Sequence, residues 1–173
     1  MSHIFDWLFS QYQGIDTHLI VLEFIGVFFG FLSVWYSKQE NILVYPTGII
    51  STAIFVYILW VYGLLGDMFI NAYYFSMSVY GWYFWTRKDD NNQEVPVTKT
   101  TKKEHLWSAV IFVTTILFVI LIYKVNDKFD SCTAYVDTVT TAIFFVGMWL
   151  MAKKKLENWT YWIIGDLISV PLY

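Results

Sequence analysis

A carboxylate and two indoles share one predicted helical stripe late in the chain. Trp159, Trp162 and Asp166 are spaced i, i+3 and i+7, which places them on one face of a helix. Indoles stack on flat heteroaromatic solutes, and cation–π attraction contributes about 0.5–2 kcal/mol. The carboxylate can balance a positive charge or accept a hydrogen bond. The stripe therefore indicates a binding face for a ring-bearing cation. An interfacial aromatic belt is the alternative for Trp159; it explains Trp162 less well and does not explain Asp166.

A second polar stripe lies in INAYYFSMSVYGWYFW. Asn71, Tyr74 and Ser78 are again spaced i, i+3 and i+7. They could contact the same solute, and Asn158, directly before the first tryptophan, could join them. Interhelical hydrogen bonding is an equal alternative for Asn and Ser, because membrane helices use such side chains as contacts of about 0.6–2 kcal/mol.

Two further acids, Glu23 and Asp137, lie near the ends of apolar segments. A charge at the centre of a bilayer costs about 2.5–3.5 kcal/mol on insertion scales, so these groups should face a cavity or a partner. Local pairing and a functional role both remain open for them. Asp67 lies at a helix boundary, where water can solvate it, and we expect no function for it.

An enzyme would need more than these acids. A membrane-embedded hydrolase could pair Asp137 with Asp166, but it would also require a nucleophile or a metal site. The three histidines lie outside the middle of every apolar segment, and Cys132 is the single cysteine. We therefore expect no enzyme, metal or cofactor, and no basic stripe indicates a nucleic-acid partner. A structural membrane subunit remains an alternative to a transporter.

The elements that position these residues are apolar helices. Hydrophobic residues make up 57% of the chain and charged residues only 14%, against about 25% charged in soluble domains. A span needs about 20 apolar residues, which predicts an all-α, polytopic membrane bundle of six spans. We expect an interfacial helix or a partly ordered tail over 1–17, and a solvated connector over 86–104. The predicted spans are 18–37, 42–65, 67–86, 105–124, 133–152 and 158–173.

Basic residues predict the orientation in the bilayer. The loops after the first, third and fifth spans carry nine of the 11 basic residues, whereas Lys124 and Lys128 lie on the other side. The positive-inside rule places the three loops in the cytoplasm and the amino terminus outside. The nine residues are Lys38, Arg87, Lys88, Lys99, Lys102, Lys103, Lys153, Lys154 and Lys155.

A weak internal repeat connects two parts of the chain. An offset of 117 residues aligns 30–48 with 147–165 at five identical positions: Gly30 with Gly147, Lys38 with Lys155, Glu40 with Glu157, Asn41 with Asn158, and Gly48 with Gly165. The shared orientation predicts parallel repeats, with a substrate site where they meet. The domains are then a repeat over 18–86, a loop over 87–104, a linker helix over 105–124 and an incomplete repeat over 131–173. The partner of the third span would fall after residue 173, so we expect a 3+1+3 design without its last helix; a protein complete in six spans is the alternative.

Three stretches resemble the PnuC family of bacterial vitamin transporters. They are YPTGIIST (45–52), LLGDMFINAYYFSMSVYGWYFW (64–85) and ENWTYWIIGD (157–166). The family pattern W-x-x-W-x-x-x-[N/D] falls on Trp159, Trp162 and Asp166, preceded by Glu157 and Asn158. The resemblance implies two SWEET-like three-helix repeats, a homotrimer in the bacterial inner membrane, and facilitated diffusion of nicotinamide riboside, which cytosolic phosphorylation traps.

Two departures from the family matter. We expect the family's last helix to be absent from these 173 residues, and Asp166 stands where the better-known nicotinamide riboside members carry asparagine. Related branches carry thiamine or riboflavin. Because nicotinamide riboside and thiamine are both cations, the aspartate does not separate them, and thiamine stays an alternative substrate.

Overall fold

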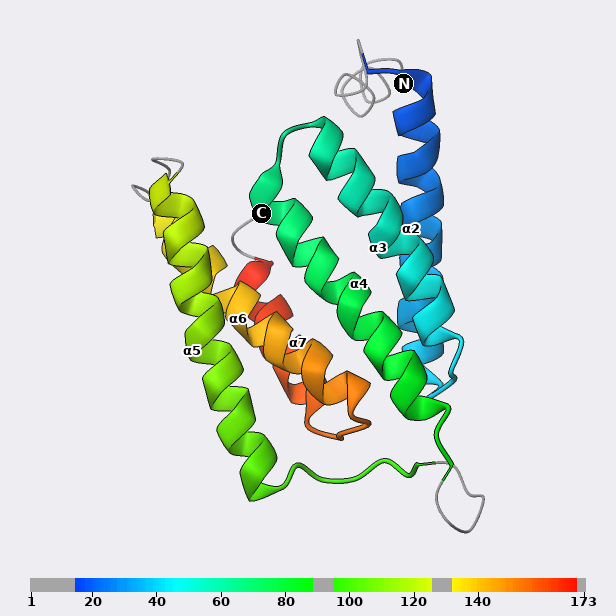
Figure 1. Ribbon diagram of the computed structural model, residues 1–173, viewed down its shortest axis with the longest axis vertical. Helices are drawn as coiled ribbons and strands as arrows, with labels where there is room; N and C mark the ends of the chain where they lie inside the picture. The colour runs from blue at the N-terminus through cyan, green and yellow to red at the C-terminus, as the bar shows by residue number, and fades with distance from the viewer. Residues whose placement is uncertain (1–14, 89–94, 126–131, 171–173) are drawn as a thin grey trace. The chain divides into compact units, whose positions relative to one another are not determined.

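The computed structural model describes residues 15–88, 95–125 and 132–170, and these residues are helical apart from short connections (Figure 1). The predicted segment 1–17 lies almost wholly outside the described residues. Every predicted span corresponds to a helix, so the all-α expectation is confirmed. The helices are α2 (Thr17–Lys38), α3 (Val44–Val61), α4 (Leu65–Trp85), α5 (Lys102–Val125), α6 (Cys132–Ala152) and α7 (Asn158–Ser169).

Four of the described helices are long and apolar enough to cross a membrane: α2, α3, α5 and most of α6. The sequence predicted six spans. The difference has a physical reason in α4, where Asp67, Asn71 and Ser78 interrupt the apolar run, and in α7, which has only 12 described residues.

The chain divides into two compact units, Met1–Asn71 and Ala72–Tyr173. In the first unit α2 packs against α3, and small residues bring the two backbones close together. Ser51 Oγ donates to the Gly26 carbonyl (2.8 Å), and Ser33 Oγ donates to the Val44 carbonyl (2.8 Å). Such hydrogen bonds hold membrane helices together where lipid removes the hydrophobic drive.

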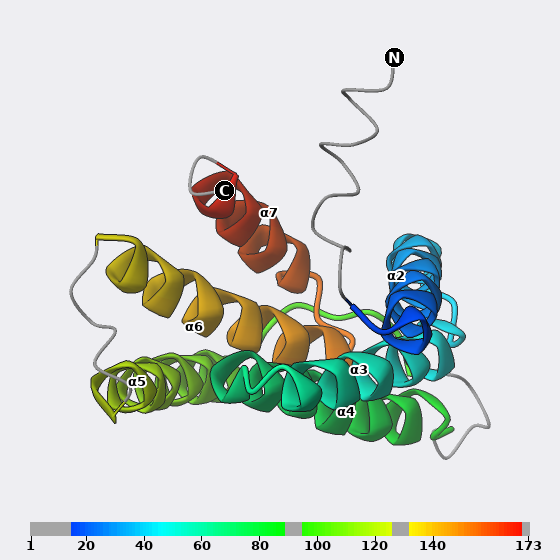
Figure 2. The same ribbon diagram turned by 90° about the horizontal axis from the view of Figure 1, so that it is seen from above.

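In the second unit α6 is the central helix, packed against both α5 and α7 (Figure 2). Most of its residues from Thr140 to Ala152 are buried. The carboxyl half of α4 also contacts α6, because Trp85 Nε1 donates to the Met151 carbonyl (3.3 Å). The core of this unit therefore follows α6.

The turns that end α2 and α6 have the same backbone geometry. Glu40 and Lys154 each adopt a left-handed conformation, with φ of 53° and 57°. The next amide in each turn bonds five residues back, from Asn41 to Tyr36 and from Lys155 to Leu150, as in a Schellman helix end. These pairs lie 114 residues apart, as do the first residues of α3 and α7, residues 44 and 158. The predicted offset of 117 is therefore wrong by three residues for these turns.

The two hairpins also have a close contact between helices at matching positions. A Cβ on Gly30 would lie 3.1 Å from Ser51 Oγ in the first hairpin. At positions 114 residues later, a Cβ on Gly165 would lie 2.8 Å from Cζ of Phe144. The contact thus joins two small residues in the first hairpin, and an aromatic ring and a glycine in the second. Because neither position keeps the same residue, an alignment by identity could not detect this match.

The connector before α5 is docked rather than solvated over its second half. Thr98 forms a parallel bridge with Lys155: its amide donates to the Lys154 carbonyl (3.1 Å), and the Leu156 amide donates to the Thr98 carbonyl (3.0 Å). Two residues on, the amide and hydroxyl of Thr100 both donate to Glu157 Oε2, at 2.9 and 2.6 Å. We refer to residues 98–100 and 154–157 together as the latch.

The hydrogen bonds of the latch lower the pKa of Glu157. The Thr100 hydroxyl, the main cause, lowers the pKa of the Glu157 carboxyl below its usual range, and the Thr100 amide and His105 act in the same direction. Hydrogen bonds to a carboxylate favour its charged form. Glu157, which the sequence marked only as part of a motif, thus ties the connector to the α6–α7 turn.

Candidate functional site

The indole of Trp162 lies among aromatic side chains from three helices. Its ring centroid is 5.4 Å from that of Phe144 on α6 and 6.4 Å from that of Tyr74 on α4. Gly147 makes room for the indole, since a Cβ there would lie 3.6 Å from Trp162 Nε1. The structure therefore brings together two residues that the sequence predicted on separate stripes, Tyr74 and Trp162.

Two further rings complete this arrangement. Tyr73 and Phe145 are stacked, with centroids 3.9 Å apart and planes within 6°. The Tyr73 hydroxyl donates to the Phe145 carbonyl (2.9 Å), which holds its ring in place. Tyr74 meets Phe145 edge-on at 5.8 Å. We call Tyr73, Tyr74, Phe144, Phe145 and Trp162 the aromatic cluster. Sequence reasoning missed Tyr73 and both phenylalanines; the pair Phe144–Phe145 shortly before Gly147 was the available signal.

The other members of the predicted stripe are more exposed. Asp166 lies one helical turn after Trp162 on the same face of α7, and it is solvent-accessible. Trp159 is 39% exposed. Exposed apolar side chains, Ile163 and Leu167, flank the carboxylate. The stripe thus runs from a ring held in the aromatic cluster to an accessible acid.

Asn158 is buried at the start of α7, with 8% of its surface exposed. Its amide nitrogen donates to the Lys155 carbonyl. Its amide oxygen has no hydrogen-bond partner among the described residues. Leaving a buried acceptor unsatisfied costs about 1–3 kcal/mol, so this oxygen is available to a water or to a ligand donor.

Asp137 is paired. The Tyr123 hydroxyl on α5 donates to Asp137 Oδ2 on α6 at 2.5 Å. Local pairing was one of the two alternatives that the sequence left open for this acid, and the structure contains it. The bond joins two helices in the apolar part of the second unit.

The remaining candidates are dispersed. Asn71 donates to the Asp67 carbonyl one turn back (3.0 Å), and Glu23 lies half-buried on α2; both belong to the first unit. Ser78 is buried on α4 in the second unit, with Tyr74. Among the candidates, the structure brings only Tyr74 and Trp162 into ring contact within the described residues.

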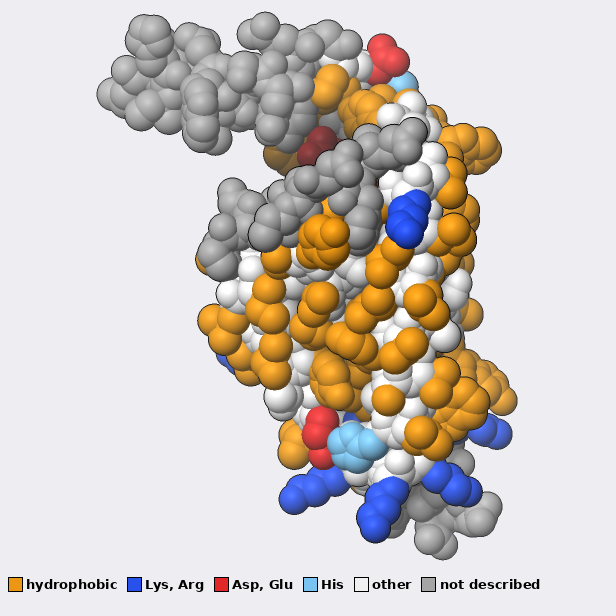
Figure 3. Space-filling view, turned by 90° about the vertical axis from the view of Figure 1, so that its left-hand side faces the viewer, with side chains coloured by type: hydrophobic (Ala, Val, Ile, Leu, Met, Phe, Trp, Pro, Cys, Tyr) orange, Lys and Arg blue, Asp and Glu red, His pale blue; other side chains and the backbone are white. Residues whose placement is uncertain are grey.

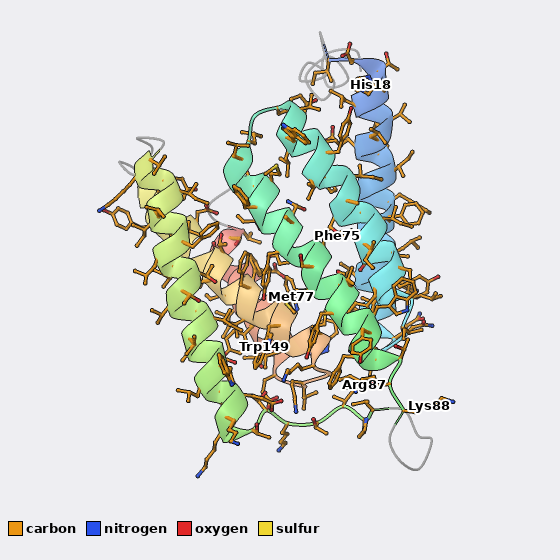
Figure 4. All side chains as sticks on the ribbon, in the orientation of Figure 1. His18, Phe75, Met77, Arg87, Lys88 and Trp149 are labelled. Carbon is orange, nitrogen blue, oxygen red and sulfur yellow. The ribbon has the colours of Figure 1, made fainter. Side chains whose placement is uncertain are left out.

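The lysines closest in sequence to the aromatic cluster are engaged elsewhere. Lys153 Nζ lies 5.2 Å from the ring of Trp149 (labelled in Figure 4), and Lys154 Nζ lies 4.5 Å from the ring of Trp85. Lys155 Nζ is 3.1 Å from Glu104 Oε2. The one acidic or basic side chain on α7 itself is Asp166. No group of three His, Cys, Asp or Glu side chains within the described ranges is arranged to hold a metal ion.

Comparison with known proteins identifies the family. The model of the nicotinamide mononucleotide transporter family matches residues 20–173. The chain belongs to this family. The predicted resemblance to PnuC transporters is thereby confirmed, as is the expectation of a transporter rather than an enzyme. With several helices able to cross a bilayer, this family member is a multi-pass membrane protein.

The relatives of this family member are named for different substrates. The nicotinamide riboside transporter PnuC of Escherichia coli K12 is 24% identical, over 95% of this chain and 82% of its own length. The riboflavin/roseoflavin transporter RibM of Streptomyces davaonensis is 25% identical, over 96% of this chain and 79% of its own. The crystal structure of the vitamin B3 transporter PnuC matches with a TM-score of 0.64 and 21% identity, covering 99% of this chain and 72% of that one. This last likeness supports the fold.

Proposed function

We propose that this protein carries nicotinamide riboside across the bacterial inner membrane by facilitated diffusion, and that cytosolic phosphorylation traps the substrate. The observation that carries the proposal is Trp162, held in the aromatic cluster one turn from the accessible Asp166. A flat pyridinium ring can stack on the indole while the carboxylate balances its charge. Trp159, Asn158 and Tyr74 would complete the contacts.

Charge favours the riboside over the mononucleotide of the family name. Nicotinamide riboside is a cation, whereas a phosphate group adds about −1.5 to −2 charges near neutral pH. A phosphate would need a basic partner, yet Lys153, Lys154 and Lys155 are engaged by Trp149, Trp85 and Glu104. Asp166 would repel a phosphate.

Riboflavin and thiamine are the rival substrates. The specific observation for riboflavin is the similarity to RibM, at an identity close to that of the PnuC relative. Asp166 favours thiamine over riboflavin, because thiamine is a cation and riboflavin is neutral. Both rings could stack on Trp162.

The proposal also includes the number of spans, their repeats, the orientation in the membrane and the oligomeric state. We infer six spans arranged as a repeat over 18–86, a linker helix over 105–124 and a second repeat over 131–173, with a cytoplasmic loop over 87–104. The matching turns after α2 and α6 support such repeats. The amino terminus would face outside, and the protein would assemble as a homotrimer. Four further residues would line the transport path or stabilise the helices around it: Glu23, Asn71, Ser78 and Asp137.

A binding experiment tests the substrate. The full chain in detergent is titrated with nicotinamide riboside, nicotinamide mononucleotide, thiamine and riboflavin, and binding is followed by calorimetry. We expect nicotinamide riboside to bind tightest and D166A, which removes both the charge and the hydrogen-bond acceptor, to weaken it by about tenfold, near 1.4 kcal/mol. Tighter binding of another vitamin, or an unchanged affinity in D166A, would overturn the assignment. Counterflow in liposomes with and without ion gradients then tests facilitated diffusion.

A further inference from the structure

Three lysines at the start of α5 have no partner among the described residues. Lys99, Lys102 and Lys103 are exposed, and the structure records neither an ion pair nor a ring contact for them within the described ranges. Lysine in the first turn of a helix is unfavourable by about 0.3–1 kcal/mol, because the helix dipole is positive there. We expect a favourable interaction of these lysines with a negatively charged group to offset this helix-dipole cost.

The nearby acids among the described residues, Glu104 and Glu157, already have other partners. Glu104 accepts from the amide and hydroxyl of Thr101, at 2.9 and 2.7 Å, in a capping box, and it also pairs with Lys155. Glu157 is held by Thr100. In this extended stretch Thr98 and Thr100 face the α6–α7 turn, so Lys99 between them points the other way. Within residues 95–104, the charged side chains left without a partner among the described residues are therefore the three lysines.

An apolar stripe continues from these lysines along α5. Trp107, Val110, Leu117 and Leu121 follow Lys103 at helical spacing, and each is exposed, Trp107 by 59% and Leu117 by 62%. Figure 3, in which α5 faces the viewer, shows hydrophobic side chains along this face and several basic side chains at its lower end, next to an acid and a histidine. We propose that an anionic phospholipid binds along α5, with its headgroup at Lys99, Lys102 and Lys103 and an acyl chain on the stripe from Trp107 to Leu121.

The three lysines and the apolar stripe beside them together favour one kind of ligand. A free phosphate would use the lysines but leave the stripe uncovered, and a neutral lipid would cover the stripe but leave the lysines unpaired. A second protein chain would need acids opposite the lysines and an apolar face beside them, whereas one anionic lipid supplies both. Each lysine near an anionic surface strengthens association about fivefold.

Brominated lipids provide the test, because bromine quenches a nearby tryptophan. The full chain is placed in nanodiscs containing brominated phosphatidylglycerol or brominated phosphatidylcholine. The fluorescence of Trp107 is obtained by subtracting the fluorescence of W107F from that of the wild type. We expect phosphatidylglycerol to be preferred about five- to twentyfold at low salt, with less preference in concentrated salt. The preference should disappear in K102Q/K103Q.

A matched variant controls for charge. K38Q/K124Q removes the same charge from other helix ends, where Lys38 and Lys124 lie in the last turns of α2 and α5, and it should keep the preference. A melting temperature for K102Q/K103Q equal to or above that of the wild type would show that it folds. The proposal is overturned by equal quenching by the two lipids, by a preference that K102Q/K103Q retains or K38Q/K124Q loses, or by a Trp107 that neither lipid quenches, as a covering protein chain would cause.

Discussion

Trp162 and Trp159 differ in what surrounds their rings. Trp162 touches Phe144 and Tyr74, so its indole is held in one orientation before any solute arrives. Trp159 is more exposed and has no ring contact within the described residues. A pre-positioned ring loses less conformational freedom on binding, and preorganisation of this kind increases affinity. Trp162 should therefore contribute more than Trp159 to binding the substrate.

Alanine substitutions test this ranking. We expect W162A to weaken binding of nicotinamide riboside about five- to thirtyfold, equivalent to about 1–2 kcal/mol of stacking, and W159A to weaken it less. W60A, which removes an exposed tryptophan on α3, serves as the control and should bind like the wild type. Calorimetry on the purified chain gives the three affinities. Equal losses in all three variants would mean that these tryptophans act only as a belt.

Gly165 is required by the packing of Phe144. A methyl group at Gly165 would overlap Cε1 and Cζ of that ring, whose centroid lies 5.4 Å from that of Trp162. We expect G165A to destabilise the protein by about 1–3 kcal/mol, as overpacking does, and to weaken substrate binding by displacing Phe144. T160A, on an exposed position of the same helix, is the matched control. The stability of the two variants is measured by their melting temperatures in detergent. A G165A protein that melts at the same temperature as T160A would contradict the packing argument.

At the scale of elements, the latch is the main addition to the predicted helices. It joins the connector to the α6–α7 turn through the Thr98–Lys155 bridge and the Thr100–Glu157 hydrogen bonds. The capping box of Thr101 and Glu104 starts α5 directly afterwards. The connector, the start of α5 and the α6–α7 turn, all in the second unit, are thus joined by one set of hydrogen bonds and the Lys155–Glu104 ion pair.

The lowered pKa of Glu157 sets the pH range of the latch. A carboxyl whose pKa is lower in the folded state contributes stability above its unfolded value, about 4.3, and loses it as the pH falls through the folded value. We expect the Thr100 amide to be protected from hydrogen exchange near neutral pH and to lose protection in acid. E157Q should reduce protection near neutral pH and remove its dependence on pH, because the neutral amide resembles the protonated acid; T160A should do neither. Protection that is independent of both pH and Glu157 would exclude the latch.

At the scale of the whole molecule, orientation is the property that the basic residues predict. The loops at Lys38, at Arg87 and Lys88, and at Lys153 to Lys155 would face the cytoplasm. Figure 4 labels Arg87 and Lys88 at the end of α4. The turn between α3 and α4, which includes Gly63, would then face outside.

Cysteine labelling tests this orientation. In a C132S background, which removes the single cysteine, G63C should react with an impermeant maleimide in intact cells. K99C should react only after the cells are permeabilised, because the positive-inside rule places it in the cytoplasm. C132S alone is the unlabelled control. The opposite labelling pattern would reverse the proposed topology.

The sequence by itself determined the class and the helices. Apolar runs, few charges and the family motifs were sufficient because helix formation in an apolar chain is local: each backbone hydrogen bond closes within four residues. It also placed Trp162 and Asp166 on one stripe, and that face exists on α7. For the same reason the boundaries of α2, α6 and α7 agree with the predicted spans within a few residues.

Only the tertiary structure decided which faces meet. The contact of Tyr74 with Trp162, the pairing of Asp137 with Tyr123 and the docking of Thr98 on Lys155 join residues that are far apart in sequence or on different helices. The offset of 114 also appeared only in the turns and in the matching contacts Gly30–Ser51 and Phe144–Gly165. These turns and contacts are defined by backbone conformation and proximity, and their residues are not identical, so an alignment of residue identities could not find the offset.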